Sequence, residues 1–379
     1  MRTIPPTISR GPLQWLDDQI LQCFCKIGEF KPGSLSPEQV AQIHVPIKQG
    51  RFGLPRLVEL APIAFVSSAY HVMESMNAIP VQVSDMISEY DAAVRELKDM
   101  DVHIPEAMDQ APIKLQHHLS EQYYNNVLDR LFNAASPVSK ARWLSLSAKH
   151  SGAVLHAIPK AYAFTMTDRE MKDFIHVRLG LGFSQEDGAK DACSACGHIF
   201  RDELSHIEHA LTCQKMKKTT QLFRHNAIEN QVAKSLKDVA FFVAHAPKID
   251  DAQPDLEFCF REEERPTLLE VSVTHPSTAS NLSKNHSDIY PRSAAKSRER
   301  EKTSKYRHLE RSVIPIVVET YGAFGPQFTE FLKLIARKKS TSSKSYNSIF
   351  NDLTSSIQCA LQRGNSTCIS RCVFGAKIL

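Results

Sequence analysis

The chain of 379 residues is 42% hydrophobic, which is sufficient for a buried core and for two or three domains. It contains no apolar run long enough to span a membrane and no apolar N-terminal stretch typical of a signal peptide, so we expect an intracellular protein without a membrane partner. The net charge of +4 is uneven, because residues 190–379 carry 28 basic and 21 acidic side chains whereas the rest carries 18 and 21. A basic C-terminal half favours a polyanionic partner, although a solvated basic face has the same composition.

The N-terminal part, residues 1–180, is expected to be mostly helical. Ser36 followed by Pro37 is typical of a helix start, with serine as the N-cap and proline at the first helical position. A turn at Gly50–Pro55 lacks the lysine and hydroxyl residue of a P-loop, so we interpret it as structural. Helical spacing of apolar residues recurs at Leu57–Ser68, Met86–Met100, Leu115–Phe132 and Val138–Lys149.

A short segment near the middle of the chain has the spacing of a metal site. Cys193 and Cys196 form a Cys-x2-Cys turn, which lets two thiolates face one ion. His209 and Cys213 are four residues apart, so on a helix they share a face and complete a tetrahedral set. These four residues predict a structural Zn²⁺ site. His206, three residues before His209 on the same face, is the alternative ligand. The odd total of nine cysteines also favours reduced thiols over disulfides.

Basic residues adjoin this module and continue into a predicted amphipathic helix at Leu222–Leu236. A small metal-folded module can present such side chains to a phosphate backbone. The residues expected to contact nucleic acid are Lys215, Lys217, Lys218, Arg224 and His225.

Two β-strands are predicted after residue 253, where alternation replaces helical spacing. Leu256–Phe260 and Leu269–Thr274 each alternate apolar and polar residues, and Arg261–Pro266 supplies the turn between them. Their apolar side chains face the core, and the carboxylates face the other side. The remaining predicted elements are a charged helix at Ala294–Arg311, a buried strand at Val313–Thr320 and helices at Pro326–Lys338 and Tyr346–Leu361.

The predicted hairpin brings acidic side chains together. A turn centred between Glu263 and Glu264 would place Glu257 opposite Glu270, with Asp255 diagonal to Glu270 and roughly 7–8 Å away at the backbone. A metal-dependent nuclease needs carboxylates that hold Mg²⁺ against the scissile phosphate. Asp255 and Glu270 are the expected Mg²⁺ ligands. Glu270 is the stronger candidate, because a carboxylate within an apolar strand costs free energy unless it has a partner.

A nuclease also needs a cation near the attacking water or the developing charge. Lys302 and Lys305 on the charged helix are three residues apart and share a face, and Lys305 is expected ahead of Lys302. Glu229 is a further candidate catalytic acid. The spacing from Asn226 to Glu229 also fits a helix capping box, which would give Glu229 a structural role.

In this order, the motifs resemble the C-terminal region of non-LTR (LINE-type) retrotransposon proteins, in which a post-polymerase helical region precedes a CCHC zinc knuckle and a restriction-like endonuclease. Pro254-Asp255 and Glu270 resemble the PD-(D/E)xK signature, with Ser272 at the position of the usual lysine. In the retrotransposon enzymes that lysine commonly comes from the next helix. His44–Tyr70 resembles the segment that follows the polymerase fingers and palm. The chain has no paired-aspartate polymerase signature, so the resemblance implies a C-terminal piece of a longer ancestral protein.

The resemblance implies an α+β fold with a helical region over residues 1–180, a zinc knuckle over 190–216 and a restriction-endonuclease-like α/β domain over 220–379, whose helices flank a central mixed sheet. It also implies a Mg²⁺-dependent endonuclease, nuclear in location, that nicks a DNA target to prime reverse transcription, with the element's RNA as a further partner. The alternative is a non-catalytic remnant that binds nucleic acid through the zinc knuckle and the basic helices.

Overall fold

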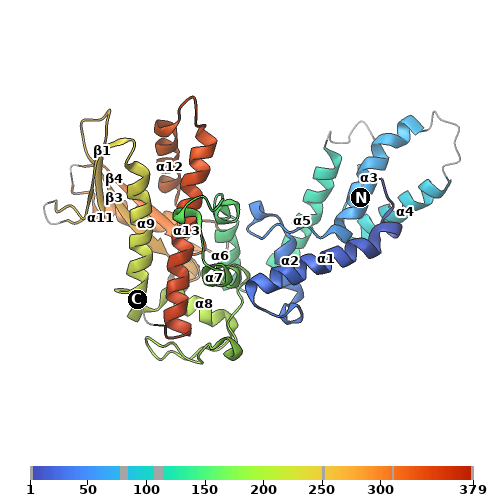
Figure 1. Cartoon of the computed structure of the whole chain (residues 1–379), viewed down its shortest axis with the longest axis horizontal. Helices are drawn as coiled ribbons and strands as arrows, with labels where there is room; N and C mark the ends of the chain where they lie inside the picture. The colour runs from blue at the N-terminus through green and yellow to red at the C-terminus, as the bar shows by residue number, and fades with distance from the viewer. Residues whose placement is uncertain (1–2, 77–83, 106–113, 250–251, 310, 377–379) are drawn as a thin grey trace. The chain divides into compact units, whose positions relative to one another are not determined.

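The computed structural model describes residues 3–76, 84–105, 114–249, 252–309 and 311–376. Within these ranges, helices and one small mixed sheet give an α+β fold (Figure 1). The chain divides into unit 1, residues 1–46 and 52–135, and unit 2, residues 47–51 and 136–379. Residues 136–180, which we expected with the N-terminal helices, therefore belong to unit 2. No helix in the described ranges is both long and apolar enough to cross a membrane.

Unit 1 is built from helices, and two of them, α2 and α3, begin where a side chain accepts hydrogen bonds from the first turn. The Ser36 side chain accepts a hydrogen bond from the Gln39 N–H at 3.3 Å, which confirms the predicted N-cap. The buried carboxylate of Asp17 accepts hydrogen bonds from the N–H groups of Leu57 and Val58 at 2.8 and 3.0 Å, at the start of the third helix. The helices are α1 (Pro6–Gly28), α2 (Pro37–His44), α3 (Leu57–Met76), α4 (Ser84–Asp99) and α5 (Leu115–Ala134).

Unit 2 contains the segments with the candidate sites. Its helices are α6 (Pro137–Leu146), α7 (Asp168–Leu179), α8 (Glu203–Thr212), α9 (Thr220–Leu236), α10 (Ala279–Asn285), α11 (Ser293–Lys305), α12 (Pro326–Lys339) and α13 (Tyr346–Val373). Its strands are β1 (Ala240–His245), β2 (Leu256–Phe260), β3 (Thr267–Thr274) and β4 (Val313–Glu319). The last helix runs well beyond the predicted end at Leu361, and α9 and α13 lie side by side (Figure 1).

The four strands found in the described residues pair in the order β1-β2-β3-β4. The first three are antiparallel, and β4 is parallel to β3, so the sheet is mixed. The predicted strands β2, β3 and β4 are confirmed. Strand β1 was not predicted, because the adjacent Phe241 and Phe242 do not alternate with polar residues. Both side chains are exposed, and a register shift lies between Ala240 and Phe242.

The sheet is covered on both faces. On one face, apolar residues of β2, β3 and β4 pack against α9, α12 and α13 in the main core, which includes Phe258, Val271, Ile316, Leu332 and Ile357. The opposite face holds a smaller cluster of Leu268, Tyr306 and Leu309, beside helix α11. Residues that alternate with the core residues along β3, Glu270 among them, therefore point toward α11.

Candidate functional site

Four residues with the predicted metal-ligand spacing come together beside α8. The Sγ atoms of Cys193 and Cys213 are 3.8 Å apart, and Cys196 Sγ lies 3.2 Å from His209 Nε2. All four ligand atoms lie within 4.8 Å of one another, so this thiol cluster (Cys193, Cys196, His209, Cys213) could hold a metal ion and is compatible with zinc. Gly197, with φ of +76°, makes the tight turn after Cys196 without the strain that a side chain would add.

The two histidines on α8 have different surroundings. His206 Nδ1 accepts a hydrogen bond from the Phe183 N–H at 3.2 Å, and its ring contacts the edge of Phe200. His209 faces the thiols and stacks on His198, with ring centroids 4.3 Å apart. Of the two alternatives left open by the sequence, the structure therefore brings His209 to the thiol cluster.

A further thiol contacts the cluster from far along the chain. Cys372 Sγ, on α13, lies 3.3 Å from Cys193 Sγ and is fully buried. Burial raises the pKa of Cys372 far above its usual range, so this side chain stays a thiol and donates to Cys193. The backbone N–H of Ser194 also donates to the Cys372 carbonyl at 2.9 Å. The cluster is thus fixed to the end of α13, and no local spacing could have indicated this contact.

Helix α8 is also tied to the ends of two strands. The Glu208 carboxylate accepts a hydrogen bond from His275 Nε2 at 2.7 Å and another from the Tyr321 hydroxyl. His275 follows β3 and Tyr321 follows β4. Glu208, the neighbour of His209, therefore links the thiol cluster to the residues that follow β3 and β4.

The acidic residues of the hairpin meet in a register that differs from the predicted one. Leu256 pairs with Leu269 and Glu257 with Leu268, so Asp255, rather than Glu257, continues the ladder toward Glu270. The predicted pairing of Glu257 with Glu270 is wrong by two residues. Glu257 instead forms an ion pair with Arg311.

Asp255 contacts both β3 and α9. One oxygen, Oδ2, accepts a hydrogen bond from the Val271 N–H at 2.7 Å and lies 3.3 Å from His225 Nε2. Glu229 on α9 is 3.9 Å from His225 Nδ1 and 2.6 Å from His245 Nδ1. Ligand atoms of His225, Glu229 and Asp255 all lie within 4.8 Å of one another, so these three side chains could also hold a metal ion. We call them the acidic set.

The contacts of Glu229 distinguish the two roles considered for it. Its carboxylate faces His225 and His245, which places it in the acidic set. Helix α9 starts at Thr220, so Asn226 lies inside the helix and is not its N-cap. The predicted capping box is therefore wrong, since Asn226 lies in the second turn of α9 and not at its start.

Glu270 is buried beside two cationic side chains and a phenol. Its Oε1 accepts from Lys302 Nζ at 2.6 Å, and its Oε2 accepts from the Tyr306 hydroxyl at 2.7 Å. Lys305 Nζ is 3.7 Å from Glu270 Oε1 and donates to the Tyr306 hydroxyl at 2.8 Å. The Lys302 side chain is 13% exposed, whereas that of Lys305 is 58% exposed. The closer and better buried lysine is thus Lys302, in the reverse of the order expected from the sequence.

Helix α11 is held over β3 by two buried glutamates. Glu319 at the end of β4 accepts a hydrogen bond from the Ala295 N–H at 3.0 Å, in the first turn of α11. Glu299 on α11 accepts from the Gln327 and Phe328 N–H groups at 3.0 and 3.3 Å, in the first turn of α12. Burial raises the pKa of Glu299 to about 7. These contacts fix the position of α11 between β4 and α12.

Sequence reasoning missed two side chains that contact the site, one on α11 and one directly after it. Arg298 Nε donates to Ser272 Oγ at 2.8 Å, and Tyr306 binds Glu270. Arg298 and Lys302 are four residues apart on one face of α11, and Tyr306, four residues further, directly follows the helix. That spacing was the available signal. Arg298 thus brings a cation to Ser272, the residue at the position where the PD-(D/E)xK pattern has lysine.

The residues expected to contact nucleic acid divide into buried and exposed groups. Arg224 is buried and donates to Asn365 Oδ1 at 3.0 Å and to the Leu211 carbonyl at 3.3 Å, so it joins α9 to α13 and does not reach the surface. The prediction for Arg224 is therefore wrong. Lys215, Lys217 and Lys218 are exposed beside the thiol cluster.

His225 lies in the acidic set and not on an open helix face. Burial lowers its pKa, but the hydrogen bond and charge of Asp255, together with the charge of Glu229, outweigh this effect and raise the pKa to about 8. An imidazolium therefore balances the two carboxylates at neutral pH when no metal is bound.

Comparison with known proteins gave no lead to function. No protein-family model matches the chain, and no curated protein matches it significantly.

Proposed function

We propose that the chain is a metal-dependent DNA endonuclease of the restriction-like type, from a non-LTR retrotransposon protein, which nicks target DNA in the nucleus and leaves ends that prime reverse transcription. The observation that carries the proposal is that Asp255 continues the β2 ladder toward Glu270 at the open end of the β2–β3 hairpin, while Lys302 binds Glu270. Acids on neighbouring strands with a cation from the next helix are what the resemblance implied.

The acidic set fits a divalent cation in its donor chemistry. Asp255 and Glu229 offer carboxylate oxygens, the ligands that Mg²⁺ prefers, and His225 adds a nitrogen. Mg²⁺ bound there would neutralise phosphate charge and lower the pKa of a bound water. Glu270, expected together with Asp255 as a Mg²⁺ ligand, lies outside this set, and its two oxygens bind Lys302 and Tyr306.

The cationic residues of α11 would act on the phosphate. Lys302 keeps an ammonium group beside Glu270, where negative charge develops on the phosphate oxygens during cleavage. Arg298, held by Ser272, adds a planar donor suited to phosphate oxygens. Because Glu299 and Glu319 hold α11 in place, these cations need little reorganisation when DNA binds.

We also propose that the thiol cluster holds structural Zn²⁺. Four protein ligands close the coordination sphere, which is typical of structural sites and leaves no position for substrate. The exposed Lys215, Lys217 and Lys218 then lie on a rigid support beside α9, from which they can contact a DNA or RNA backbone.

The test is a nicking assay on supercoiled plasmid with Mg²⁺ or with EDTA. We expect Mg²⁺-dependent conversion to open circles whose 3′ ends a polymerase extends, and a loss of at least about 100-fold with Glu270→Gln. Nicking that persists in EDTA, or a Glu270→Gln variant as active as the native chain, would refute the proposal.

A second candidate function is a nucleic-acid-binding protein without cleavage. One observation favours it: both oxygens of Glu270 already have protein partners, Lys302 and Tyr306, as in a closed structural ion pair. In that case plasmid binding would persist with no Mg²⁺-dependent nicking, and Glu270→Gln would lower stability without changing DNA affinity.

A further inference from the structure

Lysines gather in a groove of unit 2 that is separate from the thiol cluster and from the acidic set. One cavity, of about 600 Å³, lies between the segment 147–164 and the first turns of α13 and includes Lys48, Lys149 and Lys160 in its lining. A second cavity, of about 700 Å³, includes Lys234, near the end of α9. Both are lined by Lys160, Phe164 and Asp352, so they adjoin and form one groove.

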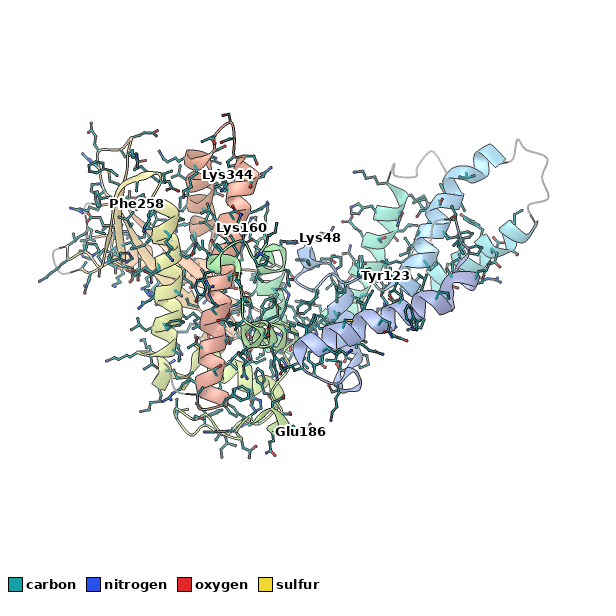
Figure 2. All side chains as sticks on the ribbon, in the orientation of Figure 1. Lys48, Tyr123, Lys160, Glu186, Phe258 and Lys344 are labelled. Carbon is teal, nitrogen blue, oxygen red and sulfur yellow. The ribbon has the colours of Figure 1, made fainter. Side chains whose placement is uncertain are left out.

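The second cavity adds three lysines from the end of α12 and the connection to α13, namely Lys338, Lys339 and Lys344. The acidic residues in the lining of the two cavities are Asp238 and Asp352. Figure 2 shows Lys344, Lys160 and Lys48 following one another along this side of unit 2. The excess of lysine gives the groove a positive potential suited to a polyanion.

The acidic residues in the groove do not fully neutralise it. Asp352 is shared by two lysines, with Oδ1 2.6 Å from Lys160 Nζ and Oδ2 3.4 Å from Lys344 Nζ. The side chains of Lys160 and Lys344 are 50% and 56% exposed. Ion pairs between exposed side chains stabilise a protein only weakly, so incoming phosphates can replace them.

One aromatic ring, that of Phe164, lines both cavities, and Tyr162 is close to it in sequence. Lys160 Nζ sits 4.8 Å from the centroid of the Phe164 ring, and Tyr162, two residues earlier, is 78% exposed. Arg363 on α13 lies 4.4 Å from the centroid of the Tyr162 ring and donates to the Tyr162 carbonyl at 2.7 Å, so this segment is held rigidly. Rings fixed beside a basic groove are the usual platform for unpaired bases, whereas the bases of a duplex stack on each other.

We propose that this groove binds single-stranded nucleic acid, with the lysines on the phosphates and Tyr162 and Phe164 against the bases. The groove lies away from the proposed cleavage site, because Lys234 is nine residues along α9 from His225, on the order of 14 Å. A single strand held here and a duplex at Glu270 can therefore be bound at the same time.

The test compares two triple variants of the full chain that lose the same charge. Lys160→Gln/Lys234→Gln/Lys344→Gln alters the groove, and Lys26→Gln/Lys98→Gln/Lys114→Gln alters exposed lysines of unit 1. We expect the groove variant to bind fluorescent oligo(dT) at least about 10-fold more weakly and to lower the slope of log affinity against log salt by about 2, while the control variant changes neither. Equal affinity of the two variants would overturn the proposal.

Two further measurements separate base contacts from charge alone. Tyr162→Ala should weaken oligo(dT) binding by about 10-fold without changing the salt slope or duplex binding. Lysine acetylation mapped by mass spectrometry should show Lys160, Lys234 and Lys344 protected by oligo(dT). Three outcomes would overturn the proposal. In Tyr162→Ala, duplex binding could fall as much as oligo(dT) binding. In the native chain, the three lysines could stay reactive with oligo(dT) present, or the chain could bind anionic lipid vesicles and not oligo(dT).

Discussion

The thiol cluster and the proposed nuclease site differ in how the chain assembles them. Cys193, Cys196, His209 and Cys213 lie within a short segment, on one turn, on α8 and at the residue that directly follows α8. The proposed nuclease site, which consists of the acidic set with Glu270 and Lys302, takes its residues from α9, the start of β2, β3 and α11. Its geometry therefore depends on the register of a hairpin and on the placement of a helix. A local site can be predicted from ligand spacing alone, whereas a site built across the sheet requires the tertiary structure.

Among the variants that test this comparison, removal of one thiol from the thiol cluster should have the largest effect. Cys193→Ser should reduce bound zinc from one ion per chain to less than about a tenth and destabilise unit 2 by several kcal/mol, because structural zinc contributes directly to folding. Metal analysis and thermal unfolding measure both effects. Cys23→Ser, at an exposed thiol, is the control. Retention of stoichiometric zinc by Cys193→Ser would show that the cluster is not a metal site.

The two lysines of α11 provide the next test. Lys302→Ala should lower plasmid nicking by about 100-fold, because the buried ammonium next to Glu270 is lost. Lys305→Ala should lower it by less than about 10-fold, since that side chain is largely exposed and its ammonium is further from the carboxylate. The reverse ranking would support the order expected from the sequence and contradict the geometry described here.

A smaller effect is expected from the titration of His225. Its pKa is raised to about 8, so the stabilisation is complete below the unfolded pKa near 6.5 and is lost as pH rises through 8. Without added Mg²⁺, the free energy of unfolding should fall by about 1–2 kcal/mol between pH 6 and pH 9. His225→Asn should remove most of this fall, whereas His286→Asn, at an exposed histidine, should leave it intact. Urea unfolding at pH 6 and pH 9 measures the fall in the free energy of unfolding. An identical fall in His225→Asn would show that the titration of His225 does not cause it.

The sequence predicted the strands β2, β3 and β4 and the metal-ligand spacing, because alternation and ligand spacing are local properties. The hairpin register could not be predicted in the same way. Several consecutive charged residues, Arg261–Arg265, occupy the turn, and any of them suits its centre. The turn chosen from the sequence was displaced by one residue, and this shifted the pairing by two. The order of Lys302 and Lys305 was equally beyond sequence, since burial by the sheet and not spacing distinguishes them.

Contacts between distant segments had no local signal. Cys372 reaches Cys193 because α13 continues past its predicted end, and Arg224 is buried because Gly364 lets α13 approach α9 closely. A basic residue at the start of a predicted amphipathic helix usually faces solvent, so the sequence favoured the wrong environment for Arg224.

The most direct test of the proposed nuclease compares two acids on the same strand face. Asp255→Asn and Glu257→Gln each remove one carboxylate charge from the β2 region, but only Asp255 continues the ladder toward Glu270, whereas Glu257 pairs with Arg311. In a Mg²⁺-dependent plasmid-nicking assay, we predict a loss of at least about 100-fold for Asp255→Asn and less than about 3-fold for Glu257→Gln. Equal activity of the two variants, or a greater loss with Glu257→Gln, would contradict the proposed nuclease site.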